Sequence, residues 1–427
     1  MKNNRNNRIN QVQENTLVIG IDIAKKLHYA CAVDMRGREL DKVWKISQSR
    51  EGFTQFNEAV QHLMEKHQKT DVIIGFEATG HYWKNLAFHL KLNDIPFVIV
   101  NPMHVKQSKE MDDNLQTKND AKDARVIAKL LPNGYFSVPR DMSSVDHHLR
   151  QGSSMRERLR KEIGAVKNRI QRWIDLYFPE FRQVFKDYGQ QELTVLKLTP
   201  LPEDIRDASV EELVRQQKEA GAKYAGRPKM VKLIELAQRS IGISESAYMA
   251  RIEIQCLVHQ HELLASQLED VNAEMVEQAK SLPEFSYLVS IKGISENMVS
   301  ELLAETGSLQ NYNHPRQIIK LAGFTLRENS SGKHQGTKKI SKRGRKGLRR
   351  LLYKAILPLI QNNTAFHIVY TYYHSREHNP LSRKEAMVVV CRKLIQVLHG
   401  LSTHKEVFNP ERMLEDLSYV TESKKVA

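Results

Sequence analysis

The stretch LVIGIDIA (Leu17–Ala24) decides how this chain is interpreted, because it places one acid, Asp22, inside an apolar run. Apolar residues and one glycine surround the carboxylate, and the run predicts a buried strand. An unpaired buried carboxylate costs several kcal/mol, so Asp22 requires a counter-charge. A divalent cation would supply that charge if other acids converge on the same point.

The sequence after Asp22 predicts strands in close succession and then alternating helices and strands. Strands are expected at residues 28–34, 41–47, 71–76 and 97–100, and helices at residues 51–67 and 81–92. This order is that of an α/β RNase H-like fold, in which the first strand is central and later strands pair parallel to it. Asp22 and Glu77 would then end two neighbouring strands at the edge of the sheet where ligands usually bind.

Two further acids lie in KNDAKDAR (residues 118–125), which predicts a helix with Asp120 and Asp123 on one face. Four oxygen donors without cysteine or paired histidine favour Mg²⁺ or Mn²⁺ over zinc. Each acid alone also has a structural explanation: a backbone-bonded Asp22, a turn at Glu77, and a salt-bridged helix surface at Asp120 and Asp123. Their combination in this order favours a metal site.

Composition points to a polyanion as partner. The 427 residues carry a net charge of +15, which favours nucleic acid first and an anionic membrane second. No apolar run approaches the ~20 residues of a spanning helix. The N-terminal residues lack the apolar core of a signal peptide, and residues 1–16 are expected to form a flexible tail. Three cysteines without CxxC spacing argue against zinc or disulfides and suit a reducing cytoplasm.

The middle of the chain, residues 145–282, is expected to be helical. Two apolar seams with alternating steps of three and four predict two long helices packed antiparallel, with a small helical insertion at the far end. The seams are formed by Leu159, Ile163, Val166, Ile170, Trp173 and Tyr177, and by Leu257, His261, Leu264, Leu268, Val271 and Met275. They fit an intramolecular core or a dimer interface equally well. His261 is interpreted as a core residue rather than a ligand.

The C-terminal part, residues 283–405, combines a helical turn with a basic loop. Residues 288–305 predict two short helices around Gly293, a corner that could contact phosphate or be purely structural. Residues 326–354 contain eleven Lys or Arg and one acid, Glu328, which predicts a nucleic-acid contact surface. The residues assigned to this surface are Lys333, Lys338, Lys339, Lys342, Arg343, Arg345, Lys346, Arg349 and Arg350. Ser331, beside a glycine among these cations, could act as a nucleophile, although Ser-Gly usually marks a turn.

The blocks GIDIAKKLHYACAVD, GFEATGHYW, VNPMHVKQ, TKNDAKDARVIA, SIKGISENMVSELLAETG, LAGFTLRENSSG and ISKRGRKGLRRLLYKA follow one another along the chain. In this order they resemble the DEDD-type insertion-sequence transposases, the insertion-sequence one-ten family, and the related DNA invertases of the pilin-inversion type. The resemblance extends from about Leu17 to Ala355. Phe324 and Leu326 replace the Leu and Pro more usual in the family and remove no reactive group.

The resemblance implies a RuvC-like domain at residues 17–140, a coiled-coil region and a C-terminal transposase domain. Residues 406–427 are expected to form a tail, to which no motif is assigned. It assigns Asp22, Glu77, Asp120 and Asp123 to a metal-binding tetrad. It makes Ser331 the nucleophile that forms a phosphoserine bond to DNA, with Ser330 as an adjacent alternative. It further implies a composite site across a dimer or tetramer, double-stranded donor and target DNA, a structured bridge RNA as guide, and a cytoplasmic, nucleoid-associated location in bacteria without a membrane partner.

Two other functions fit parts of the sequence. A metal-dependent junction nuclease would use the four acids alone to deliver water, and Ser331 would be dispensable. A non-catalytic nucleic-acid-binding protein would explain the positive charge but not the four acids.

Overall fold

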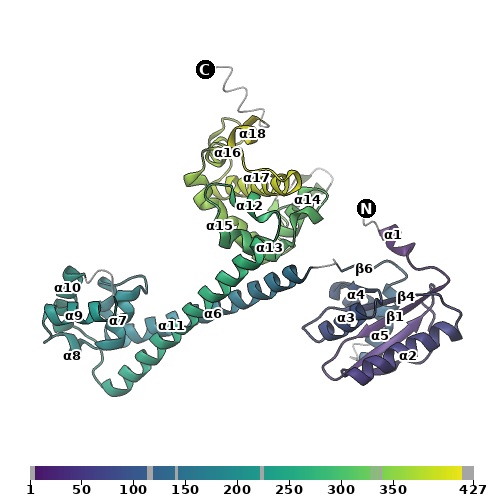
Figure 1. Cartoon of the computed structure of the whole chain (residues 1–427), viewed down its shortest axis with the longest axis horizontal. Coiled ribbons are helices and arrows are strands. Elements are labelled where there is room, and N and C mark those ends of the chain that lie inside the picture. Colours follow the sequence, from purple (N-terminus) through teal and green to yellow (C-terminus); the bar gives the residue numbers. More distant parts are fainter. Residues whose placement is uncertain are drawn as a thin grey trace. The chain divides into compact units, whose positions relative to one another are not determined.

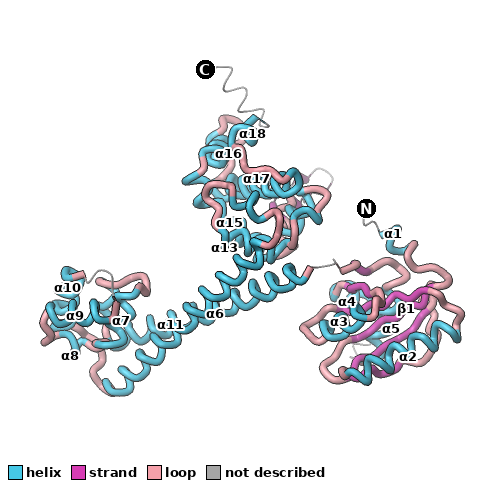
Figure 2. Tube along the Cα trace, in the orientation of Figure 1, coloured by secondary structure: helices cyan, strands magenta, loops and turns pink. Residues whose placement is uncertain are grey.

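A computed structural model describes residues 5–112, 119–139, 143–221, 226–327, 330–331, 334–335 and 339–415. The chain divides into two compact units, Met1–Asp141 and Met142–Ala427 (Figure 1). The first contains a mixed α/β sheet, and the second is almost entirely helical (Figure 2).

The first unit is built on a six-stranded sheet with the order β3-β2-β1-β4-β5-β6. Its strands are β1 (Thr16–Asp22), β2 (Leu27–Val33), β3 (Trp44–Ser47), β4 (Asp71–Glu77), β5 (Phe97–Val100) and β6 (Phe136–Ser137). The strands β1, β2 and β3 pair antiparallel, β4 and β5 continue parallel to β1, and β6 closes the edge antiparallel. The predicted meander and the position of the first strand inside the sheet are confirmed, and the order is consistent with an RNase H-like domain.

Alternation along β1 builds two cores on the two faces of this sheet. Leu17, Ile19 and Ile21 pack with α2 (Arg50–Lys66) and α3 (Trp83–Leu92). Val18 faces the opposite side, where α4 (Pro102–Asp112) and α5 (Asp120–Leu130) lie. This period of two is what a strand buried on both faces requires.

The N-terminal segment, for which the sequence predicts a flexible tail, contains a short helix. Residues Arg5–Ile9 form α1. The Arg5 guanidinium donates to the Asn133 carbonyl at 3.0 Å and lies over the Tyr135 ring, while Arg8 donates to the Phe136 carbonyl. Two arginines therefore hold this segment against the chain around β6, through bonds between residues about 128 positions apart.

Two long helices, α6 (Ser144–Tyr177) and α11 (Ala247–Lys280), form the axis of the second unit (Figure 1). They run antiparallel, as predicted: the Trp173 indole donates to the Ala250 carbonyl at 2.9 Å, whereas Gly152 lies against Met275. The two predicted seams pack against each other within one chain. His261 is buried, as expected of a core residue, and neither ring nitrogen has a partner among the described residues.

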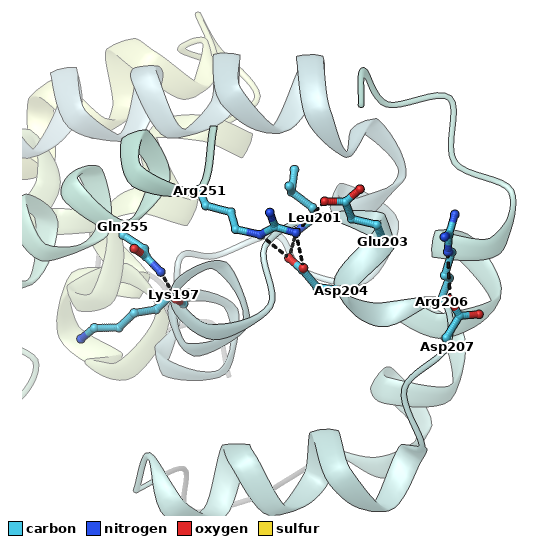
Figure 3. A network of polar contacts seen from close by, with 8 residues as sticks. All are labelled: Lys197, Leu201, Glu203, Asp204, Arg206, Asp207, Arg251 and Gln255. Carbon is cyan, nitrogen blue, oxygen red and sulfur yellow. Dashed lines mark hydrogen bonds and ion pairs between the residues drawn. The ribbon is translucent and has the colours of Figure 1, made fainter. Parts of the chain in front are cut away.

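A cap of short helices covers the ends of α6 and α11 at which Trp173 and Ala250 meet. It consists of η1 (Pro179–Gln183), α7 (Gln190–Leu198), α8 (Pro202–Ile205), α9 (Val210–Glu219) and α10 (Arg227–Gln238). Arg251 of α11 fixes α8, because its guanidinium bonds Glu203 at 2.5 Å and Asp204 at 2.6 Å (Figure 3). The predicted helical insertion is thus present, and its apolar side chains share one core with the adjoining parts of α6 and α11.

The remaining helices enclose a second core around the opposite ends of α6 and α11. They are α12 (Phe285–Val289), α13 (Glu296–Thr306), η2 (Leu309–Asn311), α14 (Pro315–Ala322), α15 (Lys346–Asn362), α16 (Thr364–Ser375), α17 (Arg383–His404) and α18 (Pro410–Glu415). Buried Arg156 of α6 forms an ion pair with Glu301 of α13, which ties the long helix to this core. Among the described helices, α17 is long and apolar enough to cross a membrane, and its apolar side chains pack into this core.

Candidate active site

The four predicted acids are carried by three neighbouring elements of the first unit. Asp22 is the last residue of β1, and Glu77 is the last residue of the adjacent parallel strand β4. Asp120 and Asp123 lie in the first turn of α5, where the helix dipole favours negative charge. Asn119 caps this helix by accepting a hydrogen bond from the Ala121 amide at 3.0 Å.

Electrostatics show that these acids gather around Asp22. Desolvation by burial, followed by the charges of Asp123, Asp120 and Glu77, raises the pKa of Asp22 to about 7, while Lys109 acts in the opposite direction. A carboxyl so close to three others keeps its proton near neutral pH unless a cation compensates the charge. Asp123, Asp120 and Glu77 therefore each act on the Asp22 carboxyl in the folded unit.

Lys109 is a part of this site that the sequence reasoning missed. Its ammonium, on α4, lies 2.5 Å from one oxygen of the buried Asp123 carboxylate. The other oxygen of Asp123 is buried and has no hydrogen-bond partner within the described residues. Lys109 thus neutralises one side of the carboxylate and leaves the other open.

The donors fit a hard divalent cation in their chemistry, because all four are carboxylates and Asp123 has an unsatisfied buried oxygen. In the arrangement described, however, no three Asp, Glu, His or Cys side chains of the described ranges form a group that could hold a metal ion. Glu77 instead accepts a hydrogen bond from the Thr79 hydroxyl, and Asp123 is paired with Lys109. The four acids thus lie in one region of the unit, but in this arrangement their carboxylates do not converge on a single metal position.

Ser331 lies in the second unit, on a short hairpin. Its backbone belongs to β8 (Ser330–Ser331), which pairs antiparallel with β9 (His334–Gln335) so that Ser331 is opposite His334. A second pair, β7 (Leu326–Arg327) with β10 (Lys339–Ile340), encloses this hairpin in the sequence. The Ser331 side chain lies outside the described residues.

The predicted basic surface separates into two groups. Lys339, Lys342, Arg343 and Lys346 are exposed, and no bond or ion pair of their side chains occurs among the described residues. The three other described arginines are engaged by the protein. Arg345 bonds Glu305, Arg349 donates to the carbonyls of Ala322 and Lys342 at 3.0 and 3.1 Å, and Arg350 forms a bidentate pair with Glu157. Lys333 and Lys338 lie outside the described residues.

The predicted turn around Gly293 is present between α12 and α13. Gly293 has a φ of 99°, and a Cβ there would lie 3.3 Å from the Leu359 side chain of α15. The Asn363 amide donates to the Lys292 carbonyl at 3.2 Å. These contacts hold the corner against α15 and give it a structural role.

Comparisons with known proteins match both ends of the chain. A DEDD transposase family, described as "Transposase", matches residues 19–179, and the "Transposase IS116/IS110/IS902 family" matches residues 286–371. The chain is 23% identical over 354 residues to the transposase for insertion sequence element IS1111A of Coxiella burnetii, covering 81% of this chain and 79% of that protein. It is 24% identical over 407 residues to the insertion element IS116 uncharacterized 44.8 kDa protein of Streptomyces clavuligerus, covering 92% and 96% of the two chains.

Proposed function

The chain belongs to the IS110 family of DEDD transposases, and from this premise we propose that it cuts and rejoins DNA strands through a covalent bond to Ser331. The observation that carries the proposal is the gathering of Asp22, Glu77, Asp120 and Asp123 at the ends of β1 and β4 and the start of α5. Mutual repulsion among carboxylates is costly to maintain, so a site that keeps four of them serves a cationic ligand or substrate complex.

Mg²⁺, or Mn²⁺ in its place, would be held by these four acids and would stabilise negative charge developing on phosphate oxygens. The residues of the chain have separate tasks in this scheme. Two of the carboxylates have oxygens that are free to bind the cation. Asp123 uses only one oxygen in its ion pair with Lys109, and Asp22 forms no ion pair among the described residues. The position of α5 on β1 keeps them together.

The Ser331 hydroxyl oxygen would attack the scissile phosphorus, forming an Oγ–P bond while the P–O3′ bond breaks. The hydroxyl proton passes to solvent, and the departing 3′ oxygen takes up a proton. Rejoining reverses these steps with the 3′ hydroxyl of another strand, so the phosphodiester energy is conserved without ATP. The exposed cations Lys339, Lys342, Arg343 and Lys346 support the proposal, because positive charge near the β8–β9 hairpin suits a phosphate substrate.

Trapping of a covalent adduct tests the proposal. A radiolabelled DNA substrate nicked near the element end should give a denaturant-resistant protein–DNA band with the wild-type chain and none with Ser331→Ala. Ser330→Ala is the matched control, since it removes the neighbouring hydroxyl and should leave the adduct intact. An adduct that persists in Ser331→Ala would refute the assignment.

The acids are tested separately on the same substrate. Asp22→Ala, Glu77→Ala, Asp120→Ala and Asp123→Ala should each abolish strand exchange while the protein remains folded by circular dichroism. Strand cleavage that leaves free 5′ phosphates, with Ser331→Ala fully active, would instead identify a metal-dependent junction nuclease. DNA binding without any activity that depends on Asp22 would identify a non-catalytic binding protein.

Guidance by a structured bridge RNA and assembly into a dimer or tetramer complete the proposal. Sequencing of RNA that co-purifies with the chain, expressed together with its flanking element, should recover one structured species. Mass photometry of the complex with DNA should show two or four copies. A chain that recombines DNA as a monomer without RNA would refute both parts.

A further inference from the structure

The cations of the long helix α6 form two classes that the sequence does not distinguish. Four are engaged with the protein: Arg156 and Arg160 with Glu301, Lys167 with the Tyr188 ring at 4.9 Å, and Arg169 with Gln260 at 3.4 Å. The other four have exposed side chains without a hydrogen bond, ion pair or ring contact among the described residues. They are Arg150, Arg158, Lys161 and Arg172.

The four unengaged cations lie on one face of the helix. At 3.6 residues per turn, they fall within a sector of about 80° and extend over about 33 Å of helix length. We call this face the α6 stripe. The exposed uncharged residues of this face are His147, Ser154 and Asn168, which can form hydrogen bonds, and the apolar Ala165 and Leu176.

No acid of α6 lies within this sector. Of the acids at its borders, Glu157 is bonded to Arg350, and Asp175 accepts from the Gln171 amide at 2.7 Å. Glu162 borders the opposite side and forms no ion pair within the described residues. Of the four cations, only Lys161 also interacts with a border acid, Glu157, within the described part of the chain, so the stripe carries an excess of positive charge on the helix that bears it.

We propose that the α6 stripe is a second nucleic-acid-binding surface, which takes the phosphate backbone of a double helix over about one turn. Its length matches the roughly 34 Å turn of duplex DNA, so a row of Arg and Lys along it can contact phosphates wherever the two strands pass it, without reading bases. The stripe is separated in sequence from the basic loop around Ser331. It positions a duplex rather than reacting with it, and it does not depend on the covalent step.

The salt dependence of binding by the full chain tests the proposal. The stripe variant carries Arg150→Gln, Arg158→Gln, Lys161→Gln and Arg172→Gln together. The control carries Arg206→Gln, Arg215→Gln, Arg227→Gln and Lys280→Gln, four exposed cations of the same unit that are each paired with a nearby carboxylate. Both variants lose the same net charge, and all eight residues are surface-exposed, so folding is preserved.

Affinities are measured by fluorescence anisotropy at several NaCl concentrations with unrelated-sequence duplexes of about 20 base pairs, one of DNA and one of RNA. Each phosphate contact contributes about 0.9 to the slope of log K against log salt. The stripe variant should lose about 3 to 4 from this slope, so that, relative to wild type, its binding weakens by at least about 1,000-fold between ~1 M and ~0.1 M salt, while the control retains the wild-type slope. A loss with only one duplex identifies that duplex as the ligand, and a loss with both identifies the shared backbone. Equal slopes for wild type and stripe variant on both duplexes would overturn the proposal.

Discussion

Gly20→Ala tests whether the packing of α5 on β1 sets the geometry of the acid site. Gly20 lies two residues before Asp22, on the face of β1 that α5 covers. A Cβ at this position would lie 2.2 Å from the Ala128 amide nitrogen, 2.5 Å from the Ala128 Cα and 2.7 Å from the Ala124 carbonyl oxygen. These are backbone atoms, so no side-chain rotation can relieve the overlap. Since ordinary contact begins near 3.4 Å, α5 must move about 1 Å away from β1.

The expected cost has two parts. Overpacking of a core costs about 1 to 3 kcal/mol, and the upper end applies here because the contacts are with backbone. The same displacement moves Asp120 and Asp123 away from Asp22, and a misplacement of about 1 Å can reduce a reaction rate about 100-fold. Scanning calorimetry should show earlier unfolding of the first unit, and single-turnover assays should show the loss of strand cleavage.

Gly164→Ala is the matched control. Gly164 lies in the interior of α6, and a Cβ there meets no atom within 4 Å. The same chemical change should stabilise this helix by about 0.5 to 1 kcal/mol and leave cleavage unchanged. Wild-type unfolding of Gly20→Ala would contradict the packing of α5 on β1. A destabilised Gly20→Ala with full activity would contradict the link between that packing and the chemistry.

Three further changes probe single side chains. In EDTA, Asp22→Asn should be more stable than wild type at pH 8 by at most about 4 kcal/mol. Because the folded pKa of Asp22 is raised to about 7, the wild type loses stability as pH rises from about 4 to 7. Urea titrations should therefore show that the difference in unfolding free energy between Asp22→Asn and wild type disappears towards pH 4. A difference that does not change with pH would refute the reasoning. Lys109→Met removes the cation paired with Asp123 and should tighten Mn²⁺ binding about 10-fold, or about 1.4 kcal/mol. Electron paramagnetic resonance measures this affinity. Weaker binding would show instead that Lys109 organises the site. Burial lowers the pKa of His261, so the stability of the wild type falls as pH drops below about 6.5. His261→Leu should add about 1 kcal/mol to the unfolding free energy at pH 7.5 and remove this acid dependence in urea unfolding. A pH profile equal to that of wild type would contradict the burial of a neutral His261.

Most of the fold could be predicted because its signals are local. The apolar run of β1, its alternation between two cores and the helical seams of α6 and α11 depend on residues within one or two turns of each other. The positions of Asp22 and Glu77 followed from the same logic, since adjacent parallel strands bring their ends to one edge. The contacts of the N-terminal segment could not be predicted, because the bonds of Arg5 and Arg8 reach residues 128 positions away.

The part of the site that could not be predicted consists of pairings between separate elements. Lys109 and Asp123 meet because α4 and α5 pack together, and nothing in the spacing of fourteen positions marks the contact. For the cations of the C-terminal part, too, the sequence does not reveal which side chains are paired in the folded protein. Arg350 and Lys346 stand on one helix in equally basic surroundings, yet Arg350 bonds Glu157 of α6 and Lys346 remains exposed.

Whether a cation is bonded within the protein or has no protein partner decides how much it can contribute to binding a polyanion. A net charge of +15 predicts a polyanion partner for the whole molecule but not the surface that meets it. An arginine that already bonds a carboxylate or a carbonyl has fewer free N–H donors for a phosphate, and a paired carboxylate also compensates its charge, so it contributes less to nucleic-acid affinity than an unpaired arginine. Arg349, which joins two carbonyls beside the basic loop, and Arg156, which is buried against Glu301, belong to this class. The cations without a bonded partner among the described residues, in the loop after Ser331 and along the α6 stripe, are therefore the ones that we propose to bind nucleic acid.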